Sequence, residues 1–416
     1  MTRLNDYEQE MLAGAHGEPR KWAMEMLLKV ARMFDADELV EVSQVHLMAD
    51  TEATGEEGLR FVEWIGSHDP SESRVVIPSV TDPRGADFSA YERIKQDERF
   101  VDMERRADAA FRKLGFMMTD TCINYQTINP PVLGEHIAFG DTGSSIYANS
   151  VLGARTNFEG GPSALAASLT GRVPRYGFHL DERRRGTTRF VVEAEPRSLS
   201  DWGALGGIVG RQMKSYWEVP VIEGIGRAPT SDEIKHFGAA LASFGSTPLF
   251  HIIGITPEAP RLDAVFDGTP PAPRRIGAAD VASFYKDFGP KNDRLDVVVF
   301  AAPQLSLFEL ETLSNHLRGR KISDKVTLIA ATSPEMKTAA DRMGFTDAIE
   351  DAGGIVLKGV CFYQMHAREI GEANGWRSLL SNSAKLVNIL GGYGYETHLA
   401  DMEACVDAAV SGRLTV

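Results

Sequence analysis

The N-terminal part of the chain alternates between helix-like and strand-like hydrophobic patterns. Apolar residues within 21–33 (KWAMEMLLKVARM) recur at helical spacing and predict an amphipathic helix. Residues 39–47 and 74–80 are short runs with several branched apolar side chains, which predict strands. Residues 90–114 are charged and periodic, and they predict a helix that ends at Gly115.

The last third of the chain has the clearest pattern, because buried strands alternate with capped helices. Strands are expected at 294–303, 325–332 and 353–362, with helices at 306–319 and 333–344 between them. Alternation of this kind predicts a parallel sheet with helices packed on its faces. We therefore expect an α/β protein whose domains have three α/β/α layers and mainly parallel sheets.

The middle of the chain has a different composition. Residues 122–180 are rich in Gly, Pro, Asn, Ser and Thr and show little periodicity, which favours a system of binding loops over a linker. Strand character returns at 188–197, and residues 203–213 predict a helix packed closely on a sheet. We expect three regions: an N-terminal α/β region at 1–120, a central region with Gly-rich loops at 121–290, and a C-terminal α/β region at 291–416.

Composition and charge narrow the class of protein. The 416 residues are 43% hydrophobic, and 58 acidic against 44 basic residues give a net charge of -14. This acidic balance argues against a nucleic-acid partner, because a phosphate backbone needs a basic surface. No run approaches the roughly 20 apolar residues of a membrane span, and the N-terminus lacks the apolar core of a signal peptide. We therefore expect a cytoplasmic protein without a membrane segment.

The three cysteines are candidates for a shared site. Cys122, Cys361 and Cys405 lie far apart in the sequence and form no CxxC pair, so they do not indicate a disulfide framework. Cys361 falls near the C-terminal end of a predicted parallel strand, where ligands bind in open α/β sheets. Spacing alone leaves two interpretations open: three unrelated buried thiols, or one centre that all three share.

Two long runs in the middle region carry a resemblance to a known family. They are YANSVLGARTN at Tyr147–Asn157 and EGGPSALAASLTGRVPRYGFHL at Glu159–Leu180. Shorter matching segments lie at 23–27, 45–50, 381–386 and 399–412. The sequence resembles the catalytic (large) subunit of the aconitase X family, within the aconitase superfamily, along nearly its whole length.

This resemblance implies a lyase with an aconitase-like fold and an iron–sulfur cluster held by three cysteines. Cys122, Cys361 and Cys405 each match a cysteine-bearing segment of the family, which puts two of them in the C-terminal region. Three thiolates leave a position on iron open for a substrate hydroxyl. The chain departs from the family pattern in four short segments, which marks it as a divergent member: 123–125, 141–143, 301–304 and 359–361.

Known members of the family act on two classes of substrate, and both reactions remove water. The resemblance implies a hydro-lyase (dehydratase) for a small hydroxy acid, with cis-3-hydroxy-L-proline preferred and mevalonate 5-phosphate as the alternative. The basic residues near the matching segments suit either substrate: Arg155, Arg172, Arg175 and Lys385. The acidic composition and the altered segments favour the hydroxyproline class. Those alterations also leave open a catalytically altered member that binds a metabolite.

Two candidate residues have both a catalytic and a structural interpretation. By analogy with the superfamily, Ser383 is the expected base, with Lys385 supplying the charged surroundings that a serine base needs. The structural alternative is that Ser383 caps the helix that follows. Arg155 is the expected clamp for the substrate carboxylate, because guanidinium binds carboxylate through two hydrogen bonds. Its structural alternative is an ion pair with an acid such as Glu159.

The remaining candidates are polar residues of the matching segments. His46 and His179 are expected to orient a substrate oxygen or move a proton, unless they are buried structural histidines. Thr156 and Asn157 would hydrogen-bond the substrate or hold their own loop. Asp141 stands where the family has another acid. It is expected to lie beside the cluster and the substrate, unless it is only a turn residue.

The resemblance also implies a protein partner. In longer family members a small swivelling domain is fused to this region, and in two-subunit members it is a separate chain. The sequence ends at Val416 with no room for that domain. We therefore expect a heterodimer with a small swivelling-domain subunit that closes the active site on a hydroxy acid.

Overall fold

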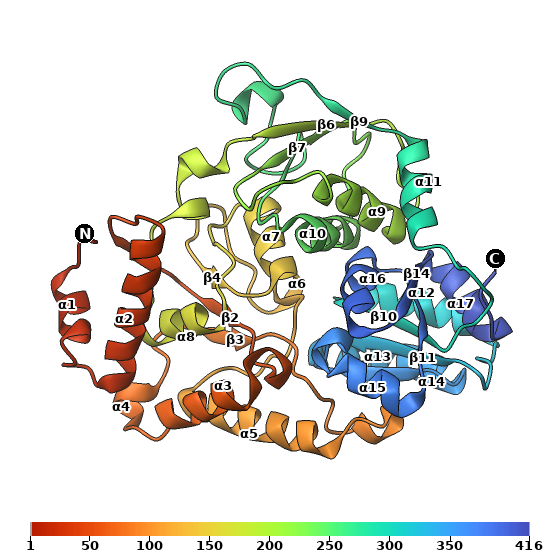
Figure 1. Ribbon diagram of the computed structural model, residues 1–416, viewed down its shortest axis with the longest axis horizontal. Coiled ribbons are helices and arrows are strands. Elements are labelled where there is room, and N and C mark those ends of the chain that lie inside the picture. Colours follow the sequence, from red (N-terminus) through yellow and green to blue (C-terminus); the bar gives the residue numbers. More distant parts are fainter. Residues whose placement is uncertain (1, 416) are drawn as a thin grey trace.

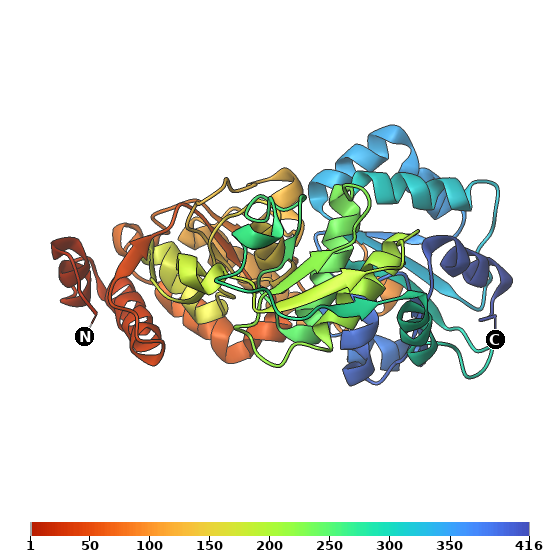
Figure 2. The same cartoon turned by 90° about the horizontal axis from the view of Figure 1, so that it is seen from above.

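Three parallel sheets divide the protein into an N-terminal, a middle and a C-terminal unit (Figure 1). The computed structural model describes residues 2–415. The N-terminal unit lies at the left and along the bottom of Figure 1, the middle unit at the top and the C-terminal unit at the right. Figure 2 shows the first and last units at opposite ends of the long axis. No helix within residues 2–415 has the length and apolar character to cross a membrane.

The N-terminal unit is built on a three-stranded parallel sheet of order β3-β2-β4, beside a small antiparallel pair, β1-β5. Its strands are β1 (Leu39–Glu41), β2 (Val45–Leu47), β3 (Ser79–Thr81), β4 (Ala138–Phe139) and β5 (Arg172–Pro174). Its helices are α1 (Asp6–Leu12), α2 (Glu18–Met33), α3 (Thr51–Ile65), α4 (Pro70–Ser73), α5 (Glu98–Leu114), α6 (Asn124–Thr127), α7 (Thr142–Ser150) and α8 (Gly161–Thr170). Val45 and Leu47 of β2 pack into a core with α2, α3, α5 and α8.

The predicted N-terminal helices are confirmed, and the predicted strands are shorter than expected. The helix predicted at 90–114 begins at Glu98 and ends at Gly115, whose φ of 89° suits glycine. The run at 39–47 forms two strands, because β1 pairs with β5 and β2 pairs with β3 and β4. Residues 75 and 76 bond to the backbones of Leu114 and Ser168 instead of extending β3.

Residues 122–180 contain two buried helices in place of much of the expected loop system. Residues Gly143–Ser150 of α7 and Ser163–Thr170 of α8 are all buried. Because small residues face every side of these helices, the sequence has no amphipathic period. The same segment supplies β4, which pairs with β2, so the N-terminal unit continues past the boundary expected at residue 120.

The middle unit is a four-stranded parallel sheet of order β8-β7-β6-β9. Its elements are β6 (Thr188–Val192), α9 (Leu199–Gly210), β7 (Pro220–Glu223), α10 (Ser231–Gly245), β8 (His251–Ile252), β9 (Arg274–Ile276) and α11 (Ala278–Asp287). The predicted helix at 203–213 is present as α9, and its closest packing is against α10. A Cβ added at Gly206 would lie 2.1 Å from the carbonyl oxygen of Phe237, so this contact requires glycine.

The C-terminal unit is a five-stranded parallel sheet of order β12-β11-β10-β13-β14. Its strands are β10 (Val297–Leu305), β11 (Thr327–Thr332), β12 (Ile355–Lys358), β13 (Ser378–Ser381) and β14 (Glu396–Leu399). Its helices are α12 (Leu307–Leu317), α13 (Pro334–Met343), α14 (Phe345–Asp351), α15 (Ala367–Asn374), α16 (Ala384–Leu390) and α17 (Met402–Ser411). The α/β class with mainly parallel sheets is therefore confirmed.

Successive residues of β10 point to opposite faces of this sheet, and helices cover both faces. Val299 packs on the face that α15 and α16 cover, whereas Val298 packs on the face that α12 and α17 cover. The chain winds from β10 outward to β12 and then returns to β13 on the other side of β10. This reversal makes a topological switch at the ends of β10 and β13, where ligands bind in such folds.

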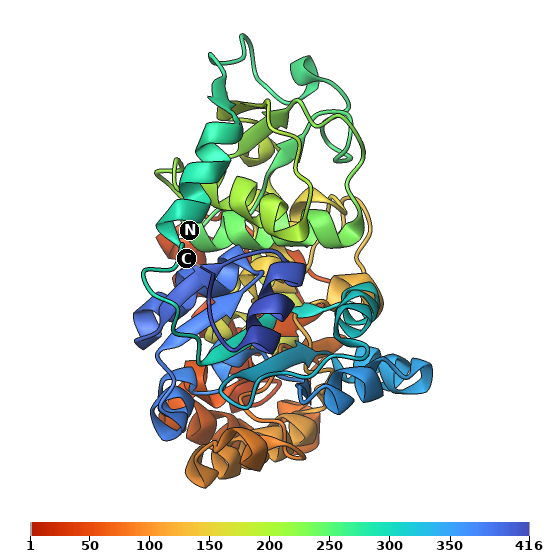
Figure 3. The same cartoon turned by 90° about the vertical axis from the view of Figure 1, so that its right-hand side faces the viewer.

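A buried ion cluster joins the middle unit to the C-terminal unit. Lys235 of α10 pairs with Glu309 of α12 and lies 3.1 Å from Asp232. His236 approaches the other oxygen of Glu309 at 2.7 Å, and Glu309 also completes a capping box with Ser306 at the start of α12. Burial opposes the charge of Glu309, but Lys235 and His236 hold its pKa at about 2. Figure 3 shows the middle unit directly above the C-terminal unit.

Candidate active site

Six of the predicted site residues lie together where the N-terminal and C-terminal units meet. His46 lies in β2, Asp141 follows β4 and Cys361 follows β12, so the C-terminal ends of strands from two sheets supply them. All six are buried, with the following exposed fractions: His46 0%, Cys122 4%, Asp141 2%, Cys361 1%, Ser383 1% and Lys385 4%. Four of the predicted residues lie elsewhere, in the segment 155–179, and Cys405 lies on α17.

Cys122 and Cys361 form a pair of neighbouring free thiols. The contact with the Cys361 side chain, together with burial, raises the pKa of the Cys122 thiol. Gln304, at the end of β10, makes two hydrogen bonds with Cys122. Its backbone N–H donates to Sγ of Cys122 over 3.4 Å, and its side-chain oxygen accepts from the Cys122 N–H over 3.2 Å.

The Gln304 amide also ties together the segments that carry the thiols. Its Nε2 donates to the carbonyl oxygens of Asp120 at 3.1 Å, Thr332 at 3.3 Å and Val360 at 3.1 Å. These acceptors come from both units, and Gln304 is fully buried. The hydrogen bonds of one side chain therefore set the spacing of the thiol pair.

Cys405 is not part of this pair. It packs with Val298 on one face of the C-terminal sheet, whereas Cys361 packs with Val299 on the other face. Its thiol lies 3.7 Å from the carbonyl oxygen of Ala400, and burial raises its pKa. The expectation that all three thiols share one centre is wrong for this structure, because the sheet separates Cys405 from the other two.

A cluster held by three thiolates therefore does not fit the described residues. Within residues 2–415, no group of three or more His, Cys, Asp or Glu side chains is placed to hold a metal ion. Beside the thiol pair, the oxygen of Gln304 already accepts the Cys122 N–H. The site offers two neighbouring sulfur atoms and no third protein thiolate.

Lys385 and Asp141 form a buried ion pair beside the thiols, with Nζ 3.3 Å from Oδ1. Asp141 is the N-cap of α7 and accepts the Ser144 N–H over 2.7 Å, so it has a helix-capping role and is not a simple turn residue. Burial opposes the charge of Lys385, but Asp141, Cys122 and Cys361 together raise its pKa. Burial likewise opposes the charge of Asp141, but the Lys385 charge and the hydrogen bond from the Ser144 N–H lower its pKa. The pair stays ionised at neutral pH.

His46 has a free lone pair in this site. Its Nε2 lies 2.8 Å from the carbonyl oxygen of Thr121 and 3.5 Å from Oδ1 of Asp82. Because a carbonyl only accepts, Nε2 carries the proton and Nδ1 is unprotonated. Nδ1 is buried and has no hydrogen-bond partner among residues 2–415. Burial lowers the pKa of His46 and keeps it neutral, so it is suited to accept a proton.

Next to His46, Gln364 links two buried carboxyl groups, those of Asp82 and Asp50. Gln364 donates to Asp82 over 2.8 Å and to Asp50 over 3.2 Å. Burial and the Asp141 charge raise the pKa of Asp82 well above its usual value. Burial and the neighbouring Glu104 raise the pKa of Asp50 to about 8. Both carboxyl groups therefore hold protons more tightly than exposed carboxyl groups do.

Ser383 has the capping role that was its structural interpretation. Its hydroxyl donates to the carbonyl oxygen of Ala302 over 2.6 Å and accepts the Leu386 N–H over 3.1 Å. A carbonyl oxygen does not take up the hydroxyl proton, and Lys385 contacts Asp141 and Thr142 instead of Ser383. A catalytic role for Ser383 stays a prediction without a proton acceptor in this arrangement.

The predicted substrate-binding residues of the signature segment hold their own loop. Arg155 donates to the carbonyl oxygen of His179 over 3.1 Å and pairs with Asp181, not with Glu159. Thr156 Oγ1 accepts the Phe139 N–H, and the Asn157 side chain spans the Tyr176 and Phe178 backbones. His179 Nδ1 lies 2.8 Å from Nδ1 of His136. None of these hydrogen bonds reaches Cys122, Asp141 or Lys385, so the binding roles remain predictions.

Sequence reasoning missed three residues of the site. Asp82 directly follows β3, so the strand-end rule that pointed to Cys361 would have found it. Gln304 attracted notice only as a departure from the family pattern. Gln364 belongs to a one-turn segment and has no sequence signal that sets it apart.

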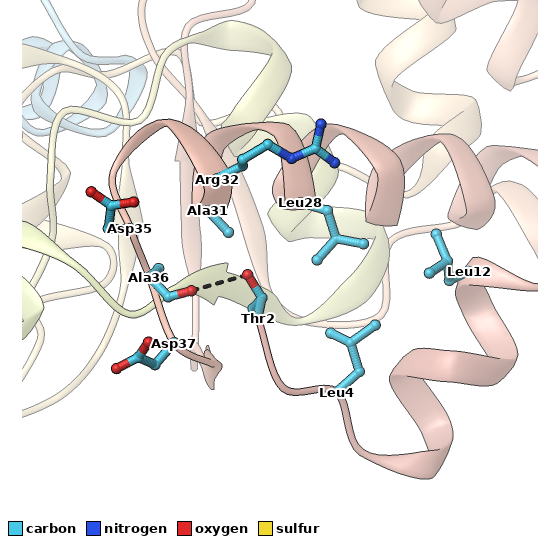
Figure 4. Close-up of a pocket in the computed structure, with 9 residues that line it drawn as sticks. All are labelled: Thr2, Leu4, Leu12, Leu28, Ala31, Arg32, Asp35, Ala36 and Asp37. Carbon is cyan, nitrogen blue, oxygen red and sulfur yellow. Dashed lines mark hydrogen bonds between the residues drawn. The ribbon is translucent and has the colours of Figure 1, made fainter.

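A separate depression lies at the edge of the N-terminal unit, away from these residues. Its volume is about 330 Å³, and Figure 4 shows Thr2 donating to the carbonyl oxygen of Ala36 across it. The residues that line it include Leu4, Leu28 and Arg32. None of the candidate site residues is among them, so this depression is not the active site.

Comparison with known families agrees with the arrangement of units. The sequence profile for the aconitase X first domain matches residues 1–182, that for the second domain matches 186–286, and that for the third domain matches 295–411. The chain therefore belongs to the aconitase X family.

Individual relatives and one solved structure are similar to the chain over nearly its whole length. The chain is 34% identical to the phosphomevalonate dehydratase large subunit of Methanothermobacter thermautotrophicus, over 94% of each chain. It is 30% identical to the cis-3-hydroxy-L-proline dehydratase of Pseudomonas aeruginosa, over 99% of this chain and 70% of that protein. The crystal structure of Thermococcus kodakaraensis aconitase X in its holo-form superposes with a TM-score of 0.87 at 28% identity, covering 98% of this chain and all of that one. The named relatives are dehydratases, which are hydro-lyases.

The raised pKa of Asp50 predicts a specific effect of pH on stability. The folded state holds the Asp50 proton up to about pH 8, whereas the unfolded state releases it near pH 4, so the free energy of unfolding falls as the pH rises between these values. Asp50→Asn keeps an oxygen to cap α3 and should reduce this slope by up to about 1.4 kcal/mol per pH unit. Urea unfolding at several pH values measures it, and an unchanged slope would refute the assignment.

Proposed function

We propose that the chain is the large subunit of a dehydratase that removes water from a small hydroxy acid, with cis-3-hydroxy-L-proline as the preferred substrate. One observation carries the proposal: a neutral His46 with a free lone pair lies beside the charged Lys385–Asp141 pair at the junction of two sheets. This arrangement combines a base with a fixed cation in a buried place, as removal of a proton next to a carboxylate requires.

Four residues of the chain have defined tasks in this proposal. His46 Nδ1 takes the proton from the carbon next to the carboxylate. The Lys385 ammonium group binds the carboxylate and stabilises the negative charge that develops on it, while Asp141 orients Lys385. Burial and the Asp141 charge raise the pKa of Asp82, which suits it to give a proton to the departing hydroxyl. Removal of water is thereby balanced: one proton leaves carbon, and one proton joins the hydroxide.

The charges around the site favour the hydroxyproline class. Among residues 2–415, Lys385 is the basic side chain that pairs with Asp141, and Asp82 and Asp50 add further carboxyl groups nearby. A substrate with one carboxylate matches a single ammonium group. A phosphorylated acid brings more negative charge and needs additional basic side chains. The carbonyl oxygens of these carboxyl groups can instead accept a hydrogen bond from a ring nitrogen.

Mevalonate 5-phosphate is the second candidate substrate because the chain is similar to a relative that is named after it. The 34% identical relative is named a phosphomevalonate dehydratase large subunit, and the alignment covers 94% of both chains. That name also supports a small second subunit as partner. The chain covers 70% of the hydroxyproline dehydratase, so that relative contains additional sequence.

A substrate screen tests the proposed reaction. The chain is purified anaerobically with a small swivelling-domain subunit and assayed on cis-3-hydroxy-L-proline and on mevalonate 5-phosphate, with trans-4-hydroxy-L-proline as a control. We expect loss of water from cis-3-hydroxy-L-proline alone. Turnover of the phosphate instead would favour the second candidate. A folded, loaded complex that turns over neither would indicate a member that only binds a metabolite.

The iron–sulfur centre that the family resemblance implies stays a proposal, and here it rests on two thiols. We expect Cys122→Ser and Cys361→Ser to lose bound iron and more than about 90% of the activity, because thiolates are the ligands that such iron prefers. Cys405→Ser is the matched control, since that thiol lies on the other face of the sheet. Iron and sulfide analysis measures the effect, and equal loss of iron in Cys405→Ser would overturn the assignment.

Two substitutions distinguish the alternative bases. His46→Gln should lower kcat by about 10²–10⁴-fold, the usual contribution of a general base. Ser383→Ala should keep kcat within about tenfold and lower stability by about 1 kcal/mol, because it removes a helix cap. Steady-state kinetics and thermal melting measure both. The reverse pattern in kcat would restore Ser383 as the base.

A further inference from the structure

A second pocket lies in the N-terminal half of the molecule, between α2, the start of α8 and the segment at 216–217. Its volume is about 420 Å³, which suits a small organic molecule. Five aromatic side chains line it: Phe34, Phe158, Tyr176, Tyr216 and Trp217. No residue with a proposed catalytic task lines it.

The aromatic rings form a connected wall. Phe34 stacks on Tyr176 with ring centroids 4.4 Å apart, and Tyr216 stands perpendicular to Trp217 at 4.8 Å. The hydroxyl of Tyr216 accepts the Phe158 N–H over 3.0 Å, which fixes this ring. Trp217 already accepts a cation on its surface, because the Arg183 guanidinium lies 5.9 Å from its centroid.

Glu159 supplies the one carboxylate in this wall. Its side chain is 1% exposed, and Oε1 has no hydrogen-bond partner among the described residues. No lysine or arginine lines the pocket to neutralise it. Burial raises the pKa of Glu159, which is the expected result for a carboxyl group without a counter-charge.

We propose that this pocket binds an organic ammonium ion with an apolar body. The N–H of the ligand donates to Oε1 of Glu159, and the apolar body packs against the rings of Tyr176, Tyr216 and Trp217. Aromatic faces attract cations through their quadrupole, and a buried carboxylate adds direction and charge. An unpartnered oxygen favours a primary or secondary ammonium over a quaternary one, because only the former carry an N–H.

The pocket shares no lining residue with the proposed active site, although the two are close along the backbone. The Glu159 N–H donates to the carbonyl oxygen of Phe139, two residues before Asp141. Because no lining residue is shared, binding of the cation is measurable without turnover. A failure of the dehydratase assay would leave this proposal standing, and the reverse also holds.

Three probes of the same shape and different charge test the proposal. Calorimetric titration of the full chain compares cyclohexylammonium, cyclohexanol and cyclohexanecarboxylate. We expect saturable binding of cyclohexylammonium that is at least about tenfold tighter than binding of the other two, because only the ammonium ion satisfies Glu159. Equal binding of the alcohol would show an apolar pocket without charge selection and would overturn the proposal.

Matched variants locate the binding. Glu159→Gln should weaken cyclohexylammonium binding by at least about tenfold, whereas Glu182→Gln removes the same charge from an exposed position and should not change it. Lys385→Met should also leave the binding unchanged, which excludes the proposed active site as the place of binding. Circular dichroism confirms that each variant is folded. Unchanged binding in Glu159→Gln, or loss of binding in Lys385→Met, would refute the assignment.

Discussion

The hydrogen bonds of the Gln304 carboxamide are the interaction on which the site geometry depends. They connect the segment before Cys122, the end of β11 and the segment before Cys361, which belong to two different units. A carboxamide can do this because it carries both donors and an acceptor on one planar group. Its position at the end of β10, beside the topological switch, explains why catalytic candidates from two sheets meet there.

Around this junction the protein buries more acidic than basic side chains. Asp141 pairs with the Lys385 ammonium group, and Gln364 links Asp82 and Asp50. Burying charges is costly unless they are paired, and here one carboxylate is paired while burial raises the pKa of the other two. The same neighbourhood therefore contains an ionised pair, a proton donor and a proton acceptor, which is what acid–base chemistry needs.

The sequence was most informative where local rules decide the structure. The alternation of strands and capped helices predicted three of the five strands of the C-terminal sheet, and it predicted α12 and α13, whose caps are Ser306 and Ser333. The helices within 122–180 escape the periodicity rule because α7 and α8 are rich in small residues and are buried on nearly every side. Cys405 was misplaced because a resemblance at one segment does not reveal which face of a sheet a helix covers. Arg155 is expected to bind a substrate carboxylate because its actual partner, Asp181, lies 26 positions away in the sequence and gives no local signal.

The Gln304 hydrogen bonds also couple the spacing of the thiols to the docking of the two units. The same carboxamide donates to the carbonyl oxygens of Asp120, two residues before Cys122, and of Val360, directly before Cys361. A shift of one unit against the other would stretch one of these hydrogen bonds and change the separation of the two sulfur atoms at the same time. The sulfur–sulfur separation therefore reports on the alignment of the units.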